Sequence, residues 1–253
     1  MNDGKELINK HRYFLKDTKR KSINFAYTDQ NKGIAPPPIE KPYSVDASRI
    51  KLSKIDSLKE KYNIKLTEAI WRRESRRQYS KKPINLEELS FLLWATQGIR
   101  YISGPNAFRN VPSAGCRHAL ETYLAIFNVE DVNPGIYRYL PLSHEIIFEK
   151  DEENLKENII RGTMGQRFAG SGALTFIWAA IPYRMEWRYG LASYKEIALD
   201  AGHVCQNLYL ASEAIGAGTC AIAAYDQEYM DQLLNLDGED EFVIYIAPVG
   251  KLE

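Results

Sequence analysis

The stretch "YKEIALDAGHVCQNLYLASEAIGAG", residues 194–218, carries the most regular hydrophobic pattern in the chain. One row of apolar side chains recurs at spacings of four and three residues: Ile197, Ala201, Val204, Leu208, Ala211 and Ile215. These spacings are typical of one face of an α-helix, and Gly216 and Gly218 predict where the helix ends. A second apolar row runs along another side: Ala198, Cys205 and Tyr209. We therefore expect a long helix that is buried on more than one side, either central or at an interface.

Helix and strand signals alternate on either side of this segment. Asn85 and Glu88 form a capping-box pattern before an apolar stretch that ends at Gly98, and Asp226 is a predicted helix N-cap. Further helices are expected over 66–74 and 152–161. Strands are expected over 122–129, 173–181 and 242–250, with a hairpin over 135–150. This interleaving predicts an α+β fold in which helices flank a mixed sheet.

Composition narrows the class of protein. The 253 residues carry 33 Lys and Arg against 33 Asp and Glu, so the formal net charge is zero. A nucleic-acid or anionic-membrane partner favours a basic excess, and we expect neither partner. The three cysteines are widely spaced and the N-terminus lacks the apolar core of a secretion signal, which predicts reduced thiols in a cytoplasmic protein. The four histidines are scattered, so we expect no metal site.

The first 50 residues differ from the rest of the chain. They are polar and basic, and they pass through "IAPPPIEKPY" at residues 34–43, whose prolines favour an extended backbone. We interpret residues 1–50 as an N-terminal arm with a proline-rich linker, lying across a domain formed by residues 51–253. A poorly ordered tail is the alternative interpretation.

The stretch "RRESRRQYS", residues 72–80, concentrates four arginines around one serine. Arg73, Ser75 and Arg77 alternate, so an extended backbone places their side chains on one side. Two guanidinium forks and a hydroxyl suit a phosphate group, and Lys251 after the last predicted strand offers a further positive charge. The stretch is therefore either an anion-binding site or a solvated basic turn.

Four stretches, taken together and in order, resemble the nitroreductase family of flavoproteins. They are the arginine stretch leading into "PINLEEL" (83–89), "VPSAGCRHALETYLAIFNVE" (111–130), "PGIYRYLPLSHEI" (134–146), and "DAGHVCQNLYLASEAIGAGTCAIAAYD" (200–226) with "PVGK" (248–251). In particular they resemble the branch of SagB-type dehydrogenases, which includes the azoline oxidases of peptide natural-product pathways. The resemblance implies a mixed sheet of four to five strands, flanked by helices, in an intertwined homodimer that binds two flavin mononucleotide (FMN) molecules at its interface.

The resemblance also implies roles toward FMN for individual residues. Arg73, Ser75 and Lys251 hold the phosphate and ribityl chain, and Arg77 reaches the pyrimidine edge of the ring. Glu74 stands where the family has a second arginine, so its side chain is expected to point away and only its backbone to contribute. A loop covers the flavin of the partner subunit: Pro112, Ser113, Ala114 and Gly115. A segment after the long helix lies beside the ring: Cys220, Ala221 and Ile222.

The sequence departs from the azoline-oxidising branch at a Lys-Tyr pair, where this chain has Arg188 and Tyr189. Arginine stays protonated and is unsuited to act as a base, whereas Tyr189 is able to transfer a proton. The resemblance therefore implies an FMN-dependent oxidoreductase with two open substrate classes. These are thiazoline or oxazoline peptides, and nitro compounds or quinones reduced with NAD(P)H. A non-redox module that binds a phosphate-containing ligand is the competing class.

Overall fold

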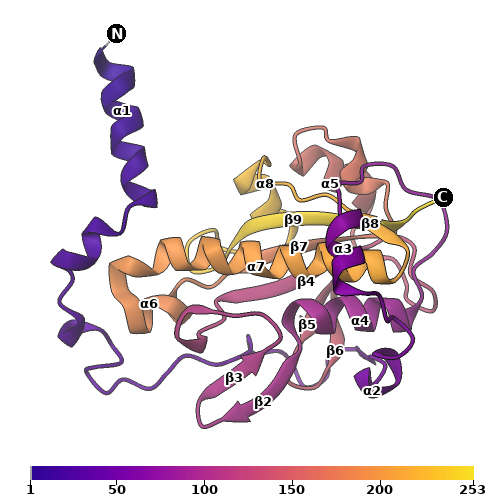
Figure 1. Ribbon diagram of the computed structural model, residues 1–253, viewed down its shortest axis with the longest axis horizontal. Coiled ribbons are helices and arrows are strands. Elements are labelled where there is room, and N and C mark those ends of the chain that lie inside the picture. The colour runs from indigo at the N-terminus through magenta and orange to yellow at the C-terminus, as the bar shows by residue number, and fades with distance from the viewer. Residues whose placement is uncertain (1) are drawn as a thin grey trace.

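A seven-stranded sheet lies at the centre of the computed structural model, which describes residues 2–253 (Figure 1). The strand order is β1-β6-β5-β4-β7-β9-β8, and every neighbouring pair is antiparallel. The strands are β1 (Arg49–Lys51), β4 (Leu120–Ile126), β5 (Gly135–Leu140), β6 (Glu145–Lys150), β7 (Leu174–Ala180), β8 (Ala217–Thr219) and β9 (Phe242–Lys251). The α+β class is confirmed. The sheet is larger than the four or five strands implied, because the short strands β1 and β8 extend its edges, and parallel pairing among residues 2–253 is limited to isolated bridges.

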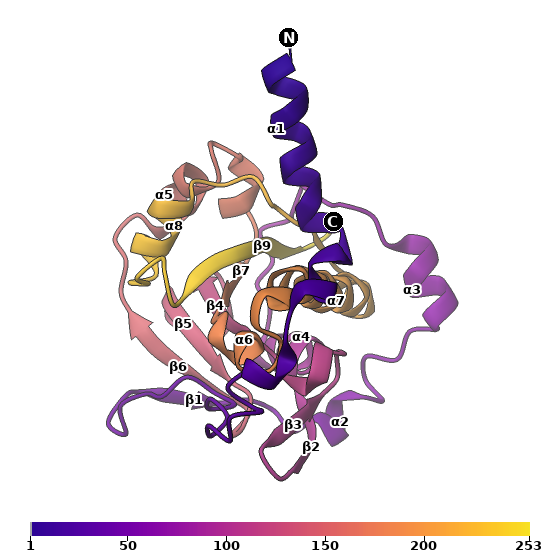
Figure 2. The same ribbon diagram turned by 90° about the vertical axis from the view of Figure 1, so that its left-hand side faces the viewer.

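Helices cover both faces of this sheet (Figure 2). One face carries α4 (Leu86–Gln97) and α7 (Ser193–Ala214), and the other carries α5 (Leu155–Gly162) and α8 (Gln227–Leu233). Side chains of the central strands alternate accordingly, since Leu124 and Phe176 belong to the core under α4 and α7 while Tyr123 and Ile177 belong to the other. The period of two along each buried strand thus divides the interior into two hydrophobic cores.

The remaining elements lie at the margins of these layers. They are α2 (Ile55–Leu58), α3 (Leu66–Arg72), α6 (Tyr183–Tyr189), the hairpin of β2 (Ile99–Ser103) and β3 (Asn106–Arg109), and the short 3₁₀ turns η4 (Ala114–Cys116), η5 (Arg167–Gly170) and η6 (Gly190–Ala192). None of the helices within residues 2–253 combines the length and the apolar character needed to cross a membrane.

The helix ends follow the capping signals. The Asn85 side chain accepts from the Glu88 amide at 2.9 Å and the Glu88 carboxylate accepts from the Asn85 amide at 3.1 Å, so the capping box is formed. Asp226 accepts from the Tyr229 amide at 3.1 Å and starts α8. The long helix α7 ends one residue before Ile215, and Gly216 takes a left-handed φ of 63° that redirects the chain into β8.

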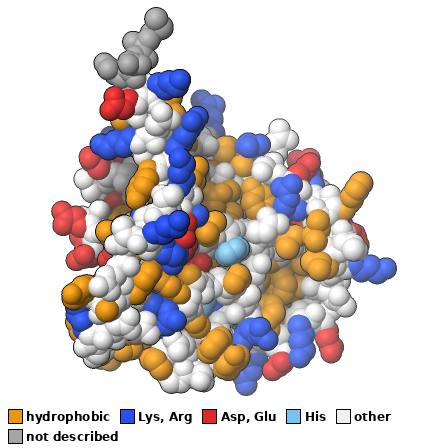
Figure 3. Space-filling view, turned by 60° about the vertical axis from the view of Figure 1, so that its left-hand side comes forward, with side chains coloured by type: hydrophobic (Ala, Val, Ile, Leu, Met, Phe, Trp, Pro, Cys, Tyr) orange, Lys and Arg blue, Asp and Glu red, His pale blue; other side chains and the backbone are white. Residues whose placement is uncertain are grey.

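The N-terminal residues form α1 (Asn2–Arg12) and three 3₁₀ turns, η1 (Tyr13–Leu15), η2 (Asp17–Ser22) and η3 (Phe25–Tyr27), followed by extended backbone. Helix α1 stands away from the body, and Figure 3 shows Lys and Arg side chains gathered along this part of the chain. The extended part is anchored, because Arg138 donates to the Lys41 carbonyl at 2.9 Å and the Lys41 amide donates to Glu121 at 2.9 Å. The boundary near residue 50 stays a prediction.

Candidate functional site

The arginine stretch is held against the edge strand β8. Helix α3 ends at Arg72, and the extended backbone that follows forms an isolated parallel bridge between Ser75 and Thr219. The Arg76 amide donates to the Thr219 carbonyl at 2.9 Å, which fixes the register. Gly218 is required here, since an added Cβ would lie 2.5 Å from the Arg76 side chain.

The four arginines of the stretch fall into two pairs. Arg72 lies 3.1 Å from Glu68 and 3.5 Å from Glu213, and Arg76 lies 2.7 Å from Glu74. In contrast, Arg73 and Arg77 have no carboxylate within 4.0 Å among residues 2–253.

These two guanidiniums lie instead over aromatic rings, Arg73 over Tyr209 at 5.4 Å and Arg77 over Phe168 at 5.5 Å. The positive charges left without a counterion are therefore those of the two arginines expected to hold an anion.

Two other candidate cofactor residues form ion pairs within the protein. The Glu74 carboxylate is exposed and paired with Arg76, and its orientation relative to an anion stays a prediction. The Lys251 ammonium donates to Glu88 at 2.6 Å and to the Ile215 carbonyl at 2.5 Å. Its charge is thus already balanced by the carboxylate of the α4 capping box. Arg73 and Arg77 carry the unbalanced charge of the site.

Tyr209 on α7 lies at the junction of the candidate cofactor residues, and the sequence patterns did not single it out for function. Its hydroxyl accepts from the Ala221 amide at 2.8 Å and lies 3.0 Å from the Ser75 hydroxyl. Its ring lies under Arg73. A signal did exist, because a tyrosine in an otherwise apolar helix row needs a partner for its hydroxyl.

The segment after β8 contains both satisfied and open backbone donors. Cys220 is buried, the Ala221 amide donates to Tyr209, and the Ile222 amide donates to the Ile246 carbonyl at 2.7 Å. The next two residues, Ala223 and Ala224, are exposed, and their amides have no acceptor within the part of the chain that the structure describes. The open donors of this segment therefore lie one or two residues beyond Ala221 and Ile222.

The loop of Pro112, Ser113, Ala114 and Gly115 meets the pair Arg188 and Tyr189 within the same chain. Gly115 has a left-handed φ of 57°, and an added Cβ would lie 2.6 Å from the Tyr189 hydroxyl and 2.7 Å from Arg188. The Ser113 hydroxyl accepts from the His118 amide at 2.9 Å, which closes the loop, and Pro112 is exposed. The structure thus brings together two sets of predicted residues that are far apart in sequence.

Asp200 on α7 is a second residue that the sequence patterns did not single out. It is 5% exposed and lies beside Ser113 and Ala114. Burial raises the pKa of this carboxyl to about 6, although the hydrogen-bonding groups of Ser113 and Ala114 act in the opposite direction. An acidic residue three positions after Ile197 falls on the buried face of the helix, which is the signal that would have identified it.

Helix α7 therefore carries two clusters. Asp200 adjoins the 112–115 loop with Arg188 and Tyr189, and Tyr209 adjoins Arg73, Ser75 and Ala221. Nine residues separate Asp200 from Tyr209, which at 1.5 Å per residue is about 14 Å along the helix. The two clusters are distinct within one chain.

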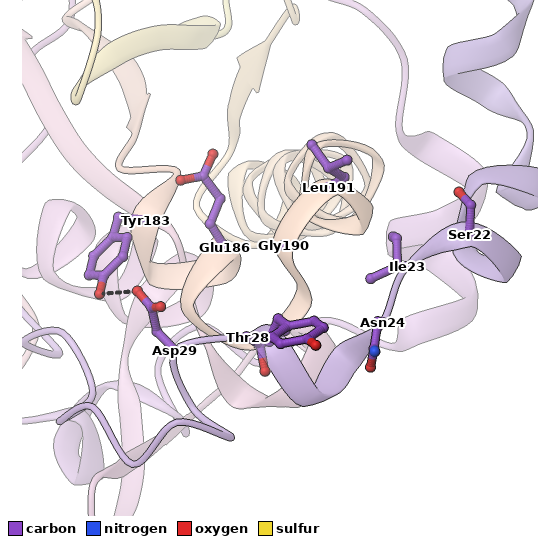
Figure 4. Close-up of a pocket in the computed structure, with 10 residues that line it drawn as sticks. Ser22, Ile23, Asn24, Thr28, Asp29, Tyr183, Glu186, Gly190 and Leu191 are labelled. Atoms are coloured by element: carbon purple, nitrogen blue, oxygen red, sulfur yellow. Dashed lines mark hydrogen bonds between the residues drawn. The ribbon is translucent and has the colours of Figure 1, made fainter.

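Two pockets adjoin these clusters. One of about 470 Å³ lies beside Pro112 and Ser113 and includes Arg100 and Arg109 in its lining. The other, of about 490 Å³, lies between the N-terminal arm and α6, and Figure 4 shows the hydrogen bond of 2.9 Å from Tyr183 to Asp29 that ties these segments together. Among residues 2–253 no group of three or more His, Cys, Asp or Glu is placed to hold a metal ion.

The chain thus combines an α+β sheet covered by helices on both faces with two arginines that have no carboxylate partner within the described residues and a loop of small residues. The sequence profile of the nitroreductase family matches residues 70–251, and the chain belongs to that family. A candidate nitroreductase of Methanocaldococcus jannaschii is 31% identical over 188 residues, which cover 74% of this chain and 91% of the relative. The family is one of oxidoreductase enzymes.

Solved structures share the fold. A candidate nitroreductase from Ralstonia eutropha superposes with a TM-score of 0.68 at 25% identity, covering 87% of this chain and 95% of the other. A chain of the microcin synthetase complex of E. coli, solved with a truncated precursor of the microcin bound, superposes with a TM-score of 0.60 at 19% identity. That likeness covers 91% of this chain and 83% of the other, and it concerns the fold alone.

Proposed function

We propose that the protein is an FMN-dependent oxidoreductase that acts as a homodimer, with NAD(P)H as its electron donor. The observation that carries the proposal is the division of the arginine stretch into two paired and two unpaired guanidiniums. The Arg73 guanidinium is half-buried, where a cation without a counterion is costly, whereas Arg77 is exposed. A phosphate group is the anion that planar guanidinium forks bind best.

The residues present fit this cofactor. Arg73 and Ser75 offer donors to a phosphate, and Arg77 offers a positive charge further along the same extended backbone. The exposed amides of Ala223 and Ala224 suit the polar edge of a flat ring, because small side chains allow close approach of the backbone. FMN supplies the two-electron chemistry when bound, so the protein needs only to bind it, orient it and exclude side reactions.

The 112–115 loop is proposed to cover the FMN of the partner subunit. The separation of about 14 Å along α7 between this loop and the Arg73 cluster supports the proposal. In a twofold dimer the loop of one chain is able to complete the site of the other. A cytoplasmic location is part of the same proposal and is supported by three free cysteines.

A test of the cofactor is direct. The purified protein should be yellow, or should become so on titration with FMN, and dithionite or NADH should bleach the visible absorption. A colourless protein that takes up no FMN would contradict the proposal. A protein that binds phosphate-containing ligands but never bleaches would support the non-redox alternative.

Azoline oxidation is a second candidate, favoured by Tyr189. Its hydroxyl lies against Gly115 and has no hydrogen-bond partner among residues 2–253, so it is free to exchange a proton with a substrate. A reductase of nitro compounds or quinones needs no such group. We therefore propose that Tyr189→Phe abolishes turnover of thiazoline peptides and leaves reduction of nitroaromatics unchanged, which steady-state assays with both substrate classes would separate.

A further inference from the structure

Tyr209 connects the candidate phosphate residues to the helix that spans the molecule. Its hydroxyl oxygen accepts a hydrogen bond from the Ala221 amide, with a nitrogen–oxygen distance of 2.8 Å. The same hydroxyl lies 3.0 Å from the Ser75 hydroxyl. The phenol is therefore fixed from one side by the backbone and faces the serine on the other.

The direction of these hydrogen bonds follows from the available hydrogens. The Ala221 amide is able only to donate, so the Tyr209 oxygen is the acceptor in that contact. The phenolic hydrogen then needs an acceptor of its own, and the Ser75 oxygen is the one within reach. If Tyr209 donates to Ser75, the serine hydrogen stays free, and Ser75 is exposed to solvent. The chain of donors thus ends on an exposed hydroxyl group whose hydrogen is free to bond to a ligand.

The ring of Tyr209 also positions the charged guanidinium of Arg73. The Arg73 guanidinium lies 5.4 Å from the ring centroid, a distance typical of a cation–π contact. Arg73 has no carboxylate within 4.0 Å in the described chain, so the ring is its main positioning contact. One side chain therefore orients both a guanidinium and a hydroxyl.

We propose that Tyr209 is a positioning residue that aims the Ser75 hydroxyl and the Arg73 guanidinium at a single phosphate group. The proposal rests on FMN being the ligand. A hydroxyl polarised by a preceding hydrogen bond is a stronger donor to an anion than an isolated one. Tyr209 does not touch the ligand in this account, because its hydroxyl acts through Ser75 and its ring acts through Arg73.

The test compares FMN with riboflavin, which lacks the phosphate. Dissociation constants are measured by quenching of flavin fluorescence for the wild type, Tyr209→Phe, Ser75→Ala and the double variant. Tyr209→Phe keeps the ring under Arg73 and removes only the hydroxyl. Tyr225→Phe is the matched control, because its hydroxyl bonds to the Val243 carbonyl at 2.9 Å near α8 and takes no part in the arginine cluster.

We expect Tyr209→Phe to weaken FMN binding roughly 2- to 12-fold, the effect of losing one hydrogen bond between neutral groups, and to change riboflavin binding little. The double variant should bind FMN with the same affinity as Ser75→Ala, within about twofold, since the Tyr209 hydroxyl acts through the serine. The control should bind both flavins as the wild type does. Because the preference for phosphate is a ratio within one protein, a general loss of stability would not mimic it.

Three results would overturn the inference. Tyr209→Phe with an unchanged preference for FMN over riboflavin would show that the phenol does not act on the phosphate site. Effects of Tyr209→Phe and Ser75→Ala that multiply in the double variant would show that the two groups act independently. A wild-type protein that binds neither flavin would overturn both this inference and the proposed function, whereas either of the first two results in a protein that binds FMN would overturn the inference alone.

Discussion

At the scale of single residues, Arg73 and Arg161 occupy similar environments with different expected roles. Each lies over a tyrosine ring, Arg73 over Tyr209 at 5.4 Å and Arg161 over Tyr229 at 4.8 Å, on opposite faces of the sheet. Arg73→Ala should weaken FMN binding about 10- to 100-fold with the fold retained, since charge-assisted hydrogen bonds contribute roughly 1.5–3 kcal/mol each. Arg161→Ala should leave binding unchanged. Flavin titration measures both affinities, and equal affinity in the two variants would indicate that the arginine stretch is a solvated basic turn.

Asp200 makes stability depend on pH. Because burial raises the pKa of its carboxyl to about 6, the folded protein binds this proton more tightly than the unfolded chain does. The contribution to stability is therefore most favourable below about pH 4, falls as the pH rises from about 4 to 6, and is constant above. Nearby His203 acts against the shift and Glu196 adds to it.

Asp200→Asn should remove that dependence. Relative to the wild type, the variant should gain on the order of 2–3 kcal/mol in unfolding free energy between pH 4 and pH 7.5, which is about two pKa units. Urea denaturation at a series of pH values measures the difference in unfolding free energy between the two proteins. The contributions of the other titrating groups cancel in this difference. A difference between the two proteins that stays flat across this range would show that the carboxyl ionises normally.

Sequence patterns identify the residues of the site that depend on local spacing. Arg73, Ser75 and Arg77 stand out because alternation places them together on any extended backbone. Which arginines stay unpaired was not predictable, since Glu213, the buried partner of Arg72, comes from the end of α7. Tyr209 was assigned only to a helix row, because the period of 3.6 carries no information about what lies opposite a hydroxyl.

At the scale of elements, the 112–115 loop packs against the end of α6. An alanine Cβ at Gly115 would lie 2.6 Å from the Tyr189 hydroxyl and 2.7 Å from Arg188, on a backbone with a φ of 57°. Gly104, in the β2–β3 hairpin, has a similar φ of 54° and open space around it. Gly104→Ala should lower the free energy of unfolding by about 1 kcal/mol, because only the left-handed backbone opposes the new side chain. Gly115→Ala should lower it by roughly 2–4 kcal/mol and should also lower turnover.

Thermal unfolding and steady-state turnover of the two glycine variants give the comparison. Equal destabilisation by Gly104→Ala and Gly115→Ala would mean that the loop moves away from α6 without a cost in free energy. The contact between the loop and α6 would then not stabilise the fold. Lower turnover in Gly115→Ala alone would tie the geometry of Arg188 and Tyr189 to catalysis.

Elements with strong periodicity or caps were predictable, whereas elements defined by contact were not. The helix α7, the capping box of α4 and the long strands β4, β7 and β9 follow from local patterns. The three-residue strands β1 and β8 are too short for a period to register, and each exists because a longer neighbour supplies its hydrogen bonds. Strand β2 is mostly exposed, so its sequence lacks a clear alternation, and β3 alternates over only four residues.

At the scale of the whole molecule, helix α3 presents apolar side chains to solvent. Trp71 is 89% exposed, Leu66 66% and Ile70 57%, beside an apolar groove of about 280 Å³ between α3, α4 and α7. A patch of this kind favours an interface between copies of the chain. Light scattering at micromolar concentration should give twice the mass of one chain, and Trp71→Glu should shift it toward the monomer. Met164→Glu, at a 66% exposed site after α5, should stay dimeric.

A trans arrangement of the site makes a quantitative prediction for mixed dimers. One chain carries Arg73→Ala and Arg77→Ala, and the other carries Gly115→Ala. If the 112–115 loop completes the partner's site, a heterodimer of these two chains has one site with both kinds of lesion and one intact site. Random pairing makes half of the dimers mixed, and half of their sites are intact, so co-expression should restore about a quarter of wild-type turnover. In a cis arrangement every site carries one lesion, and turnover should stay at the level of the separate variants. Turnover per chain in the mixed preparation, set against the two variants alone, decides between the arrangements.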